Sequence, residues 1–344
     1  MNVGIGRFIV RRFAIIVMLA VLPVPSMAAD KIPMTIAAFS TPALASDQFY
    51  RNMGAYIADA PDEPFDVKLL VRGELGSDEA HFYALRRGRI QIAGVGFQSV
   101  ATAVPELTVL NAAYLLESWP EVDFVYETAV VPFINALLAE HGIVGLRLFG
   151  AAWHGIYAKT PIYVPTDAVG RRFRALIDPA SQLFVRALGA DTFQVASTEV
   201  VTALQTGLIE AGETNSHVYN ITGTSNDAPF FTRTRNTPTV IAILANKPWF
   251  DELTPAQQQR VMTAHPSMVE SGTALRADEE RLLAEAAASH VTVIEPTTEQ
   301  LALWRAVGLS THQALIDEVG GRAQELYDMV MAAKADFRAL NAAN

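Results

Sequence analysis

The sequence predicts an α/β protein with two lobes, each a mixed, mostly parallel sheet flanked by helices. Three observations support this fold. The 344 residues exceed the roughly 250–300 at which a single hydrophobic core stops growing. Strand-like and helix-like segments alternate along the chain, as they do in parallel sheets with helical crossovers. The alternation restarts after a long helical stretch at about 120–140, so we expect two sheets that close on a ligand like a flytrap.

The first lobe is expected to begin with a strand and a helix whose apolar residues recur at helical spacing. A half-buried strand follows, in which apolar and polar residues alternate. Ser77 or Asp78 can cap the next helix, which ends near Gly88. The strands expected here are 34–39, 65–69 and 89–95.

The second half repeats the pattern, and beyond residue 254 the chain is nearly all helical. Expected strands are 143–149, 156–158, 172–176, 209–211, 240–245 and 291–294, and expected helices include 179–188 and 197–206. Lobe I is assigned 31–151 plus about 240–280, and lobe II 152–239 plus about 281–344. Ligands in such folds bind in the crevice at the carboxyl ends of the strands.

The N-terminus is typical of a cleaved signal peptide, assigned to residues 1–28. Arginines 7, 11 and 12 precede an apolar run at 13–24, and Ser26 and Ala28 fit the small-residue cleavage rule. A membrane anchor is the alternative, but this run is shorter than the ~20 residues that span a bilayer. We therefore expect a periplasmic protein with no later membrane-spanning segment.

Composition excludes several classes of function. Hydrophobic residues make up 51% and charged residues 18% of the chain, which indicates a globular protein. The formal net charge of −10 becomes −13 without the three leader arginines, which argues against nucleic-acid binding. The negative net charge does not exclude an anionic ligand, because one buried arginine can determine the electrostatic potential inside a cleft. The absence of cysteine excludes disulfides and thiol catalysis.

The motifs of common enzymes are missing. The seven histidines are scattered, without the spacing of a metal site. No nucleophile elbow, P-loop or dinucleotide-binding glycine turn is present. We therefore expect no catalysis, no cofactor and no metal-ligating residue.

The segment 168–176 carries the strongest binding signal. Arg172 and Arg174 flank Phe173 on an expected strand, so the two arginines share one face while Phe173 enters the core. A guanidinium at a strand end can bind a carboxylate through two parallel hydrogen bonds. Two solvated strand arginines are the alternative interpretation of this segment alone.

Several segments, in order and over essentially the whole mature chain, resemble the solute-binding proteins of tripartite ATP-independent periplasmic (TRAP) transporters. The resemblance implies two lobes that close on a small organic acid, and delivery of that acid to a sodium-driven membrane permease. The segments that carry it are 73–76, 85–93, 170–175, 199–207, 209–213 and 253–258.

The resemblance also implies which residues bind the ligand. Arg174 falls on the carboxylate-clamping arginine of the family. Where the family has an aromatic residue and a second arginine, this chain has Trp153 and His154. After Glu213, where the family usually has Asn-Pro, it has Thr214 and Asn215. The expected ligand-binding residues are Phe39, Phe97, Trp153, His154, Arg174, Glu213, Thr214 and Asn215.

A site with one arginine and several aromatic residues favours a monocarboxylate with an apolar or aromatic body over a sugar acid, because a buried sugar needs many hydrogen-bond partners. The aromatic residues could equally be core residues, and for His217 a structural role is favoured over a ligand-binding role. Three alternatives remain open: a receptor of an ATP-driven importer or sensor, a carrier of a lipid-like ligand on the same fold, and an enzyme of the same shape.

Overall fold

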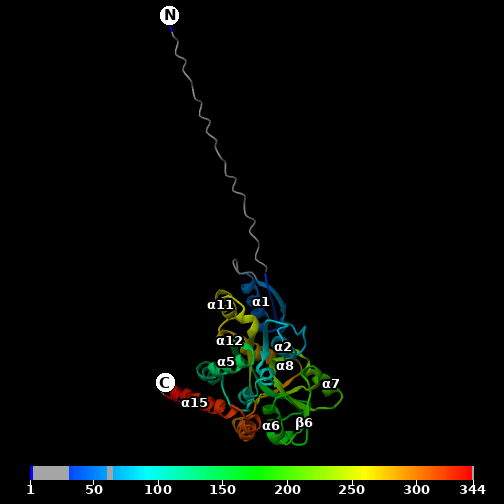
Figure 1. The fold of residues 1–344 in the computed structure, drawn as a ribbon. Coiled ribbons are helices and arrows are strands. Elements are labelled where there is room, and N and C mark those ends of the chain that lie inside the picture. Colours follow the sequence, from blue (N-terminus) through cyan, green and yellow to red (C-terminus); the bar gives the residue numbers. More distant parts are fainter. Residues whose placement is uncertain (3–30, 60–64, 343–344) are drawn as a thin grey trace. The chain divides into compact units, whose positions relative to one another are not determined.

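The computed structural model describes residues 1–2, 31–59 and 65–342. The signal-peptide prediction falls almost wholly outside these residues. Lys31–Asn344 forms one compact unit, and Figure 1 shows helices lying around its sheet. The α/β prediction is confirmed, while the lobe boundaries stay a prediction.

One part of the sheet has the strand order β2-β1-β3-β9-β4. The first strand, β1, is parallel to β2 and β3, whereas β9 is antiparallel to both β3 and β4. Its members are β1 (Ile32–Ala38), β2 (Phe65–Leu70), β3 (Ile92–Gly96), β4 (Ile143–Ala158) and β9 (Pro238–Asn246).

The other part continues from β4 in the order β7-β5-β6, with β8 beside β4 and β10 beside β8. Here β5 is parallel to β6 and β7. Its members are β5 (Arg172–Ala175), β6 (Asp191–Gln194), β7 (Ala211–Asn215), β8 (Phe230–Thr232) and β10 (Thr292–Ile294).

Strand β4 belongs to both parts. Its residues up to Trp153 pair with β9, and those from His154 onward pair with β7 and β8. The expectation of two strands at 143–149 and 156–158 is therefore wrong, because β4 runs unbroken for 16 residues. Gly155 permits this continuity: a Cβ there would lie 2.7 Å from the carbonyl oxygen of Thr232.

A second segment, residues 233–237, crosses between the same two parts of the sheet on its way from β8 to β9. The 22-residue helix α12 (Met268–Ser289) packs against β4 and also contacts β10 and helix α1 (Ala45–Ala58). Its start is fixed by a capping box of Ser267 and Glu270. Two crossings and one long helix therefore join the parts of the sheet.

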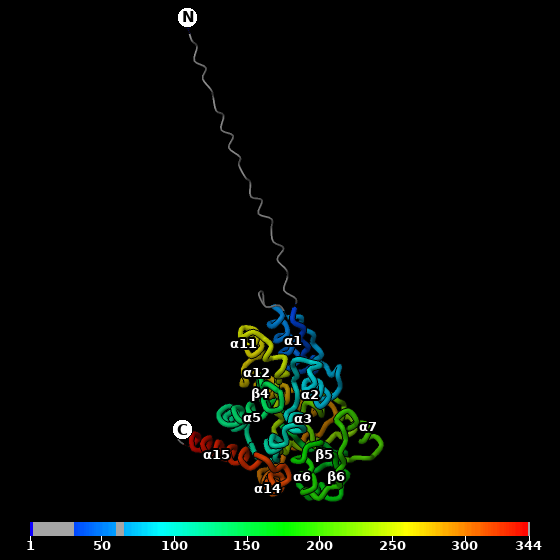
Figure 2. Tube along the Cα trace, viewed as in Figure 1, coloured from blue at the N-terminus to red at the C-terminus, as the bar shows by residue number. Residues whose placement is uncertain are grey.

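Helices cover both faces of each part, as amphipathic elements on a sheet must. Beside α1 and α12, the first part is covered by α2 (Asp78–Arg86), α3 (Phe97–Ala101), η1 (Pro105–Asn111), α4 (Trp119–Val125), η2 (Tyr126–Val130), α5 (Val131–Glu140), α10 (Lys247–Asp251), α11 (Pro255–Thr263), α14 (His312–Val319) and α15 (Ala323–Ala342). Figure 2 follows the same path as a tube.

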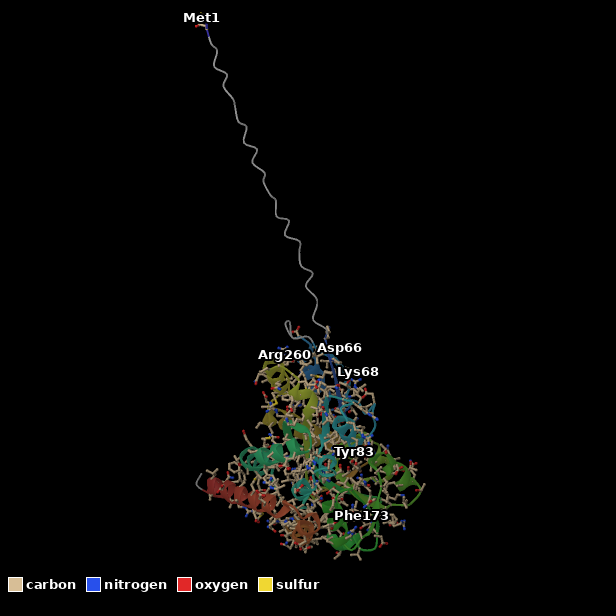
Figure 3. The ribbon with its side chains drawn as sticks, in the orientation of Figure 1. Met1, Asp66, Lys68, Tyr83, Phe173 and Arg260 are labelled. Atoms are coloured by element: carbon tan, nitrogen blue, oxygen red, sulfur yellow. The ribbon has the colours of Figure 1, made fainter. Side chains whose placement is uncertain are left out.

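The second part is covered by η3 (Pro165–Ala168), α6 (Pro179–Ala187), η4 (Ser197–Glu199), α7 (Val200–Gln205), α8 (Ser216–Ile221), α9 (Thr224–Asp227) and α13 (Thr298–Leu309). Phe173, labelled in Figure 3, is fully buried in one of its two hydrophobic clusters, as the alternation along β5 predicts. The opposite face of β5 carries the arginines.

Among the described residues, the helical run Trp119–Glu140 is long and apolar enough to cross a membrane, which the sequence analysis did not expect. The run continues through Pro132 because a π-helical turn, Tyr126–Val130, precedes that residue. Side chains along the run, including Val125, Ile134 and Leu138, belong to the main hydrophobic cluster. The run is thus a core helix of this fold.

Candidate functional site

Two neighbouring cavities lie where the chain crosses between the parts of the sheet. We call the one of about 10 Å³ the polar cavity, since polar side chains dominate its lining. The second, of about 120 Å³, is called the larger cavity. Gln98 lines both. Polar residues of the polar cavity include Gln98, Asn111, His154, Asp178, Ser181 and Glu213.

Arg174 lies on β5 and is only 4% exposed. Its Nε donates to the carbonyl oxygen of Val195 and its Nη1 to that of Glu213, both at 3.0 Å. Gly212 on β7 makes room for it, because a Cβ there would lie 2.9 Å from the Cβ of Arg174. Arg174 is not itself part of either cavity lining, but its positive charge acts on the groups that are.

Arg172 shares the face of β5 with Arg174, as predicted, but its surroundings differ. It is exposed, pairs with Glu210 at 2.8 Å, and donates from Nε to the carbonyl oxygen of Gly207. Arg172 is therefore a solvated strand arginine, as in the alternative interpretation of this segment, and Arg174 is not.

Two buried acids, Asp178 and Glu213, line the polar cavity. Asp178 caps helix α6 by accepting the backbone N–H of Ser181 at Oδ1 (3.3 Å). Burial raises the pKa of Asp178 to about 6. Glu213 accepts a hydrogen bond from Asn236 Nδ2 at 3.0 Å. Burial, with a smaller contribution from the charge of Asp178, raises the pKa of Glu213 to about 7.

His154 begins the part of β4 that pairs with β7. Burial, assisted by the charge of Arg174, lowers the pKa of His154 to about 3. The imidazole is therefore neutral at pH 7 and donates at most one hydrogen bond from its ring. Its Nε2 lies 3.4 Å from Nε2 of Gln98.

Several buried polar atoms around the polar cavity have no hydrogen-bond partner among the described residues. They are Nδ2 of Asn111, Nδ1 of His154 and Oδ2 of Asp178. Each such atom costs about 1–3 kcal/mol when it stays unsatisfied, and native proteins contain few of them. Their concentration at one cavity indicates a place prepared for a polar molecule.

The remaining predicted residues divide into two groups. Phe39 and Asn215 line the larger cavity, and Asn215 also caps α8 by accepting the N–H of Val218 at 2.9 Å. Thr214 is buried in the β4–β7 ladder and lines neither cavity.

Trp153 and Phe97 lie in the main hydrophobic cluster and not in a cavity lining. Trp153 packs against Trp119 with the rings tilted by 39° and their centroids 4.6 Å apart, and Phe97 contacts Tyr126 edge-on at 6.5 Å. These two aromatic residues therefore pack in the core, which was the alternative interpretation of them.

The sequence analysis did not identify Gln98, Asn111, Asp178 and Ser181 as site residues. Asp178 followed by Pro179 just after the arginine strand is a typical helix start. That signal, combined with the parallel sheet, places Asp178 at a strand end beside Arg174. No comparable signal marks Gln98 or Asn111.

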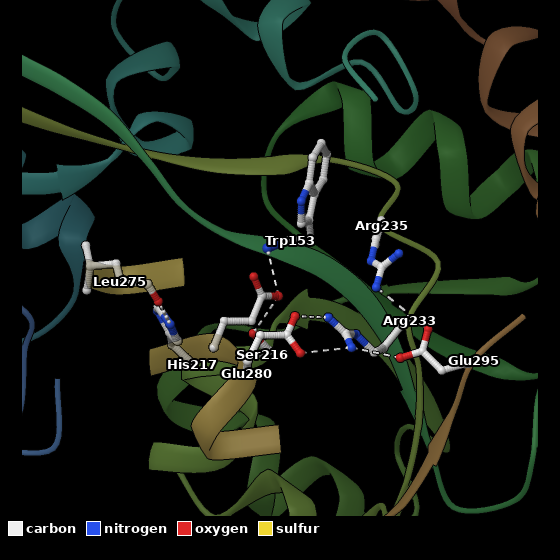
Figure 4. A network of polar contacts seen from close by, with 9 residues as sticks. Trp153, Ser216, His217, Arg233, Arg235, Leu275, Glu280 and Glu295 are labelled. Carbon is white, nitrogen blue, oxygen red and sulfur yellow. Dashed lines mark hydrogen bonds and ion pairs between the residues drawn. The ribbon is translucent and has the colours of Figure 1, made fainter. Parts of the chain in front are cut away.

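A third buried acid, Glu279 on α12, connects the helix to the crossing of β4. Figure 4 shows Trp153 and Ser216, which it contacts, and the ion pairs of Arg233 nearby. Oε1 of Glu279 accepts the backbone N–H of Trp153 at 3.1 Å and the hydroxyl of Ser216 at 3.0 Å. Burial raises the pKa of Glu279 to about 7. The next residue, Glu280, pairs with Arg233 of the second crossing. Helix α12 is thus bonded to both crossing segments.

Burial acts in the opposite sense on histidines. Burial lowers the pKa of His217 and the pKa of His265 to about 4 each. The Nε2 atom of His217 lies 3.0 Å from the carbonyl oxygen of Leu275. With His154, three buried histidines are therefore neutral in the folded protein at pH 7.

These shifts predict how stability depends on pH. The three buried acids bind more protons in the folded than in the unfolded state between about pH 4 and 7, so they make the unfolding free energy fall as pH rises. The three histidines do the reverse between about pH 4 and 6.5. We expect a nearly flat unfolding free energy from pH 5 to 6 and a fall from about 6.5 to 7.5.

Urea denaturation of the ligand-free protein in steps of half a pH unit measures this profile. A variant in which glutamine replaces Glu279 should show a shallower fall above pH 6.5. An unfolding free energy that rises between pH 6.5 and 7.5 would contradict the assignment of raised pKa values to the buried acids.

Comparisons with known proteins agree with this picture. Residues 50–318 match the family described as "Bacterial extracellular solute-binding protein, family 7". The chain is 25% identical over 303 residues to the ectoine-binding periplasmic protein TeaA of Halomonas elongata, covering 86% of each chain. It is also 25% identical over 278 residues to the C4-dicarboxylate-binding periplasmic protein DctP of Rhodobacter capsulatus, covering 79% of this chain and 81% of that protein.

Solved structures show the same fold. The periplasmic ectoine-binding protein of the TeaABC TRAP transporter of H. elongata superimposes with a TM-score of 0.81 at 22% identity, covering 88% of this chain and 99% of that one. A TRAP periplasmic solute-binding protein of Roseobacter denitrificans with bound β-D-glucuronate gives a TM-score of 0.79 at 21% identity, covering 87% and 99%.

Proposed function

Because the chain belongs to the bacterial extracellular solute-binding protein family 7, we propose that it is the periplasmic receptor of a TRAP transporter, that it binds a small carboxylate at Arg174, and that it delivers this ligand to a sodium-driven permease. The resemblance to TRAP solute-binding proteins is confirmed. Proteins of this family capture solutes and are not enzymes, as expected.

The environment of Arg174 carries the proposal of a carboxylate ligand. A guanidinium has five N–H donors, and the two hydrogen bonds of Arg174 to backbone carbonyls use two of them. Among the described residues, no carboxylate forms an ion pair with it. A buried cation with free donors in a fork is suited to bind a carboxylate through two hydrogen bonds.

Relatives support an acid as ligand. The names of relatives and related structures refer to ectoine, C4-dicarboxylates and β-D-glucuronate, all of which carry a carboxylate. The polar cavity lining favours a polar ligand body, and two of the aromatic residues on which the apolar-body hypothesis depended, Trp153 and Phe97, lie in the core. We therefore propose a small, polar carboxylate.

The size of the cavities distinguishes this proposal from a lipid carrier. The larger cavity measures about 120 Å³, well below the roughly 300–1,000 Å³ of sites for drug-sized molecules. A receptor for an ATP-driven importer would need the same ligand chemistry, but the family match favours TRAP.

Closure of two lobes is the proposed mechanism. In the described part of the chain, such a movement must bend the two crossing segments, α12 and the link from α13 to α14. A ligand bound between the lobes shifts the population toward the closed form by its higher affinity for that form. The permease would then recognise the closed receptor.

Titration of the chain without its predicted signal peptide, residues 29–344, with ectoine, succinate and D-glucuronate tests the proposal by calorimetry and by the shift in Tm. We expect at least one acid to bind at 1:1 stoichiometry and its primary amide to bind at least 10-fold more weakly, because the amide group cannot form the charge-assisted pair with Arg174. Equal affinity for an acid and its amide would refute a carboxylate site at Arg174.

A further inference from the structure

More acidic side chains line the polar cavity than a receptor for a simple carboxylate requires. Asp178 and Glu213 both line it, and these residues are only 4% and 2% exposed. The charge of Arg174 acts on both acids, and the charge of Asp178 also acts on Glu213. One cation is thus shared by two acids before any ligand enters.

A ligand with only negative charge would worsen this balance. Like charges held close together in a buried site repel strongly, because the effective dielectric constant there is well below that of water. A carboxylate at Arg174 would bring a third acidic group to the same cation. His154 offers no relief, since its depressed pKa keeps it neutral.

The unpartnered atoms show what is missing from the cavity. Oδ2 of Asp178 is a buried acceptor without a hydrogen-bond donor among the described residues, whereas Oδ1 caps helix α6. One oxygen of this carboxylate therefore has a structural role, and the other is buried without a partner in a residue that lines the cavity. A charged N–H group would satisfy the second oxygen and offset the excess negative charge.

We propose that the polar cavity is a subsite for a positively charged nitrogen, so that the ligand is a small zwitterion whose carboxylate pairs with Arg174 and whose ammonium or amidinium group donates to Asp178 and Glu213. This inference rests on the proposed function, because it assumes that Arg174 binds the carboxylate. Dicarboxylates and sugar acids, which lack a cation, are the ligands that it excludes.

Matched pairs of ring acids test the inference with the wild-type protein. Pipecolate and cyclohexanecarboxylate have nearly the same shape and differ by a charged ring nitrogen, and proline and cyclopentanecarboxylate form a second pair. We expect calorimetry to show at least 10-fold tighter binding of the zwitterion in one or both pairs.

Equal affinities within both pairs, or tighter binding of the nitrogen-free acid, would overturn the inference and leave the proposed carboxylate receptor standing. No binding by all four compounds would also overturn it, and the proposed function would still be judged by its own panel of acids and amides.

Substitution of Asp178 provides an independent measurement. Asp178→Asn retains an oxygen that can cap α6 but removes the negative charge. The variant should bind the preferred zwitterion at least 10-fold more weakly and should bind the nitrogen-free acid no more weakly than wild type. Unchanged zwitterion affinity would overturn the inference. Glu213→Gln should act in the same direction, and it keeps the test decisive if Asp178→Asn does not fold.

Asp167→Asn is the matched control. Asp167 also accepts backbone N–H groups, those of Tyr163 and Val164, at the start of a short helix, but it lines neither cavity. Its substitution should leave both affinities unchanged, which separates loss of the cavity charge from loss of a helix cap.

Discussion

Replacing Arg174 by lysine is expected to weaken carboxylate binding by at least ~100-fold. Truncating one partner of a buried, hydrogen-bonded charge pair costs about 2–5 kcal/mol, and a lysine keeps the charge but cannot present two parallel N–H donors. The burial of Arg174, whose charge acts on Glu213 in the polar cavity lining, gives the substitution this large effect. Calorimetric titration with the best-binding acid of the panel measures the loss.

Arg172→Lys is the control for this variant. Arg172 lies two residues away on the same strand and on the same face, but its guanidinium pairs with exposed Glu210. We expect its substitution to change the affinity by less than about 2-fold, because exposed ion pairs contribute at most about 1 kcal/mol even to the fold. Similar affinities for the Arg174 and Arg172 variants would contradict the proposed anchor.

Replacing Glu279 by leucine is expected to lower the free energy of unfolding by about 2–5 kcal/mol. The substitution removes the acceptor of two buried donors, the backbone N–H of Trp153 and the hydroxyl of Ser216, and each unsatisfied buried group costs about 1–3 kcal/mol. Urea denaturation at pH 6 measures the change.

Glu280→Leu is the matched control, since it changes the neighbouring residue on the same helix. Glu280 is largely exposed and pairs with Arg233, so its substitution should cost no more than about 1 kcal/mol. A loss as large as that of the Glu279 variant would show that the helix, and not the buried acceptor, determines the effect.

Local patterns were sufficient to predict the strand that carries the anchor. Alternation along β5 places Phe173 in the core and both arginines on the opposite face, and the structure agrees. Alternation does not say which arginine is buried. That difference depends on β7, where Gly212 lies beside Arg174 and leaves space for its side chain.

The aromatic residues show the limit of the sequence patterns. Trp153 and Phe97 are equally compatible with a cavity wall and with a core, because the choice depends on partners distant in the sequence. Trp119 and Tyr126 supply those partners from the long helical run. The unbroken strand β4 was missed for a similar reason: Gly155 resembles a break in the sequence, yet in the structure it permits close packing against Phe231.

A crystal structure of the mature protein with its best-binding acid tests the central claim most directly. The account predicts that both carboxylate oxygens of the ligand lie about 2.7–3.1 Å from nitrogen atoms of the Arg174 guanidinium, between the residues contributed by the two parts of the sheet. A carboxylate bound elsewhere, with Arg174 still bonded only to the carbonyl oxygens of Val195 and Glu213, would contradict it.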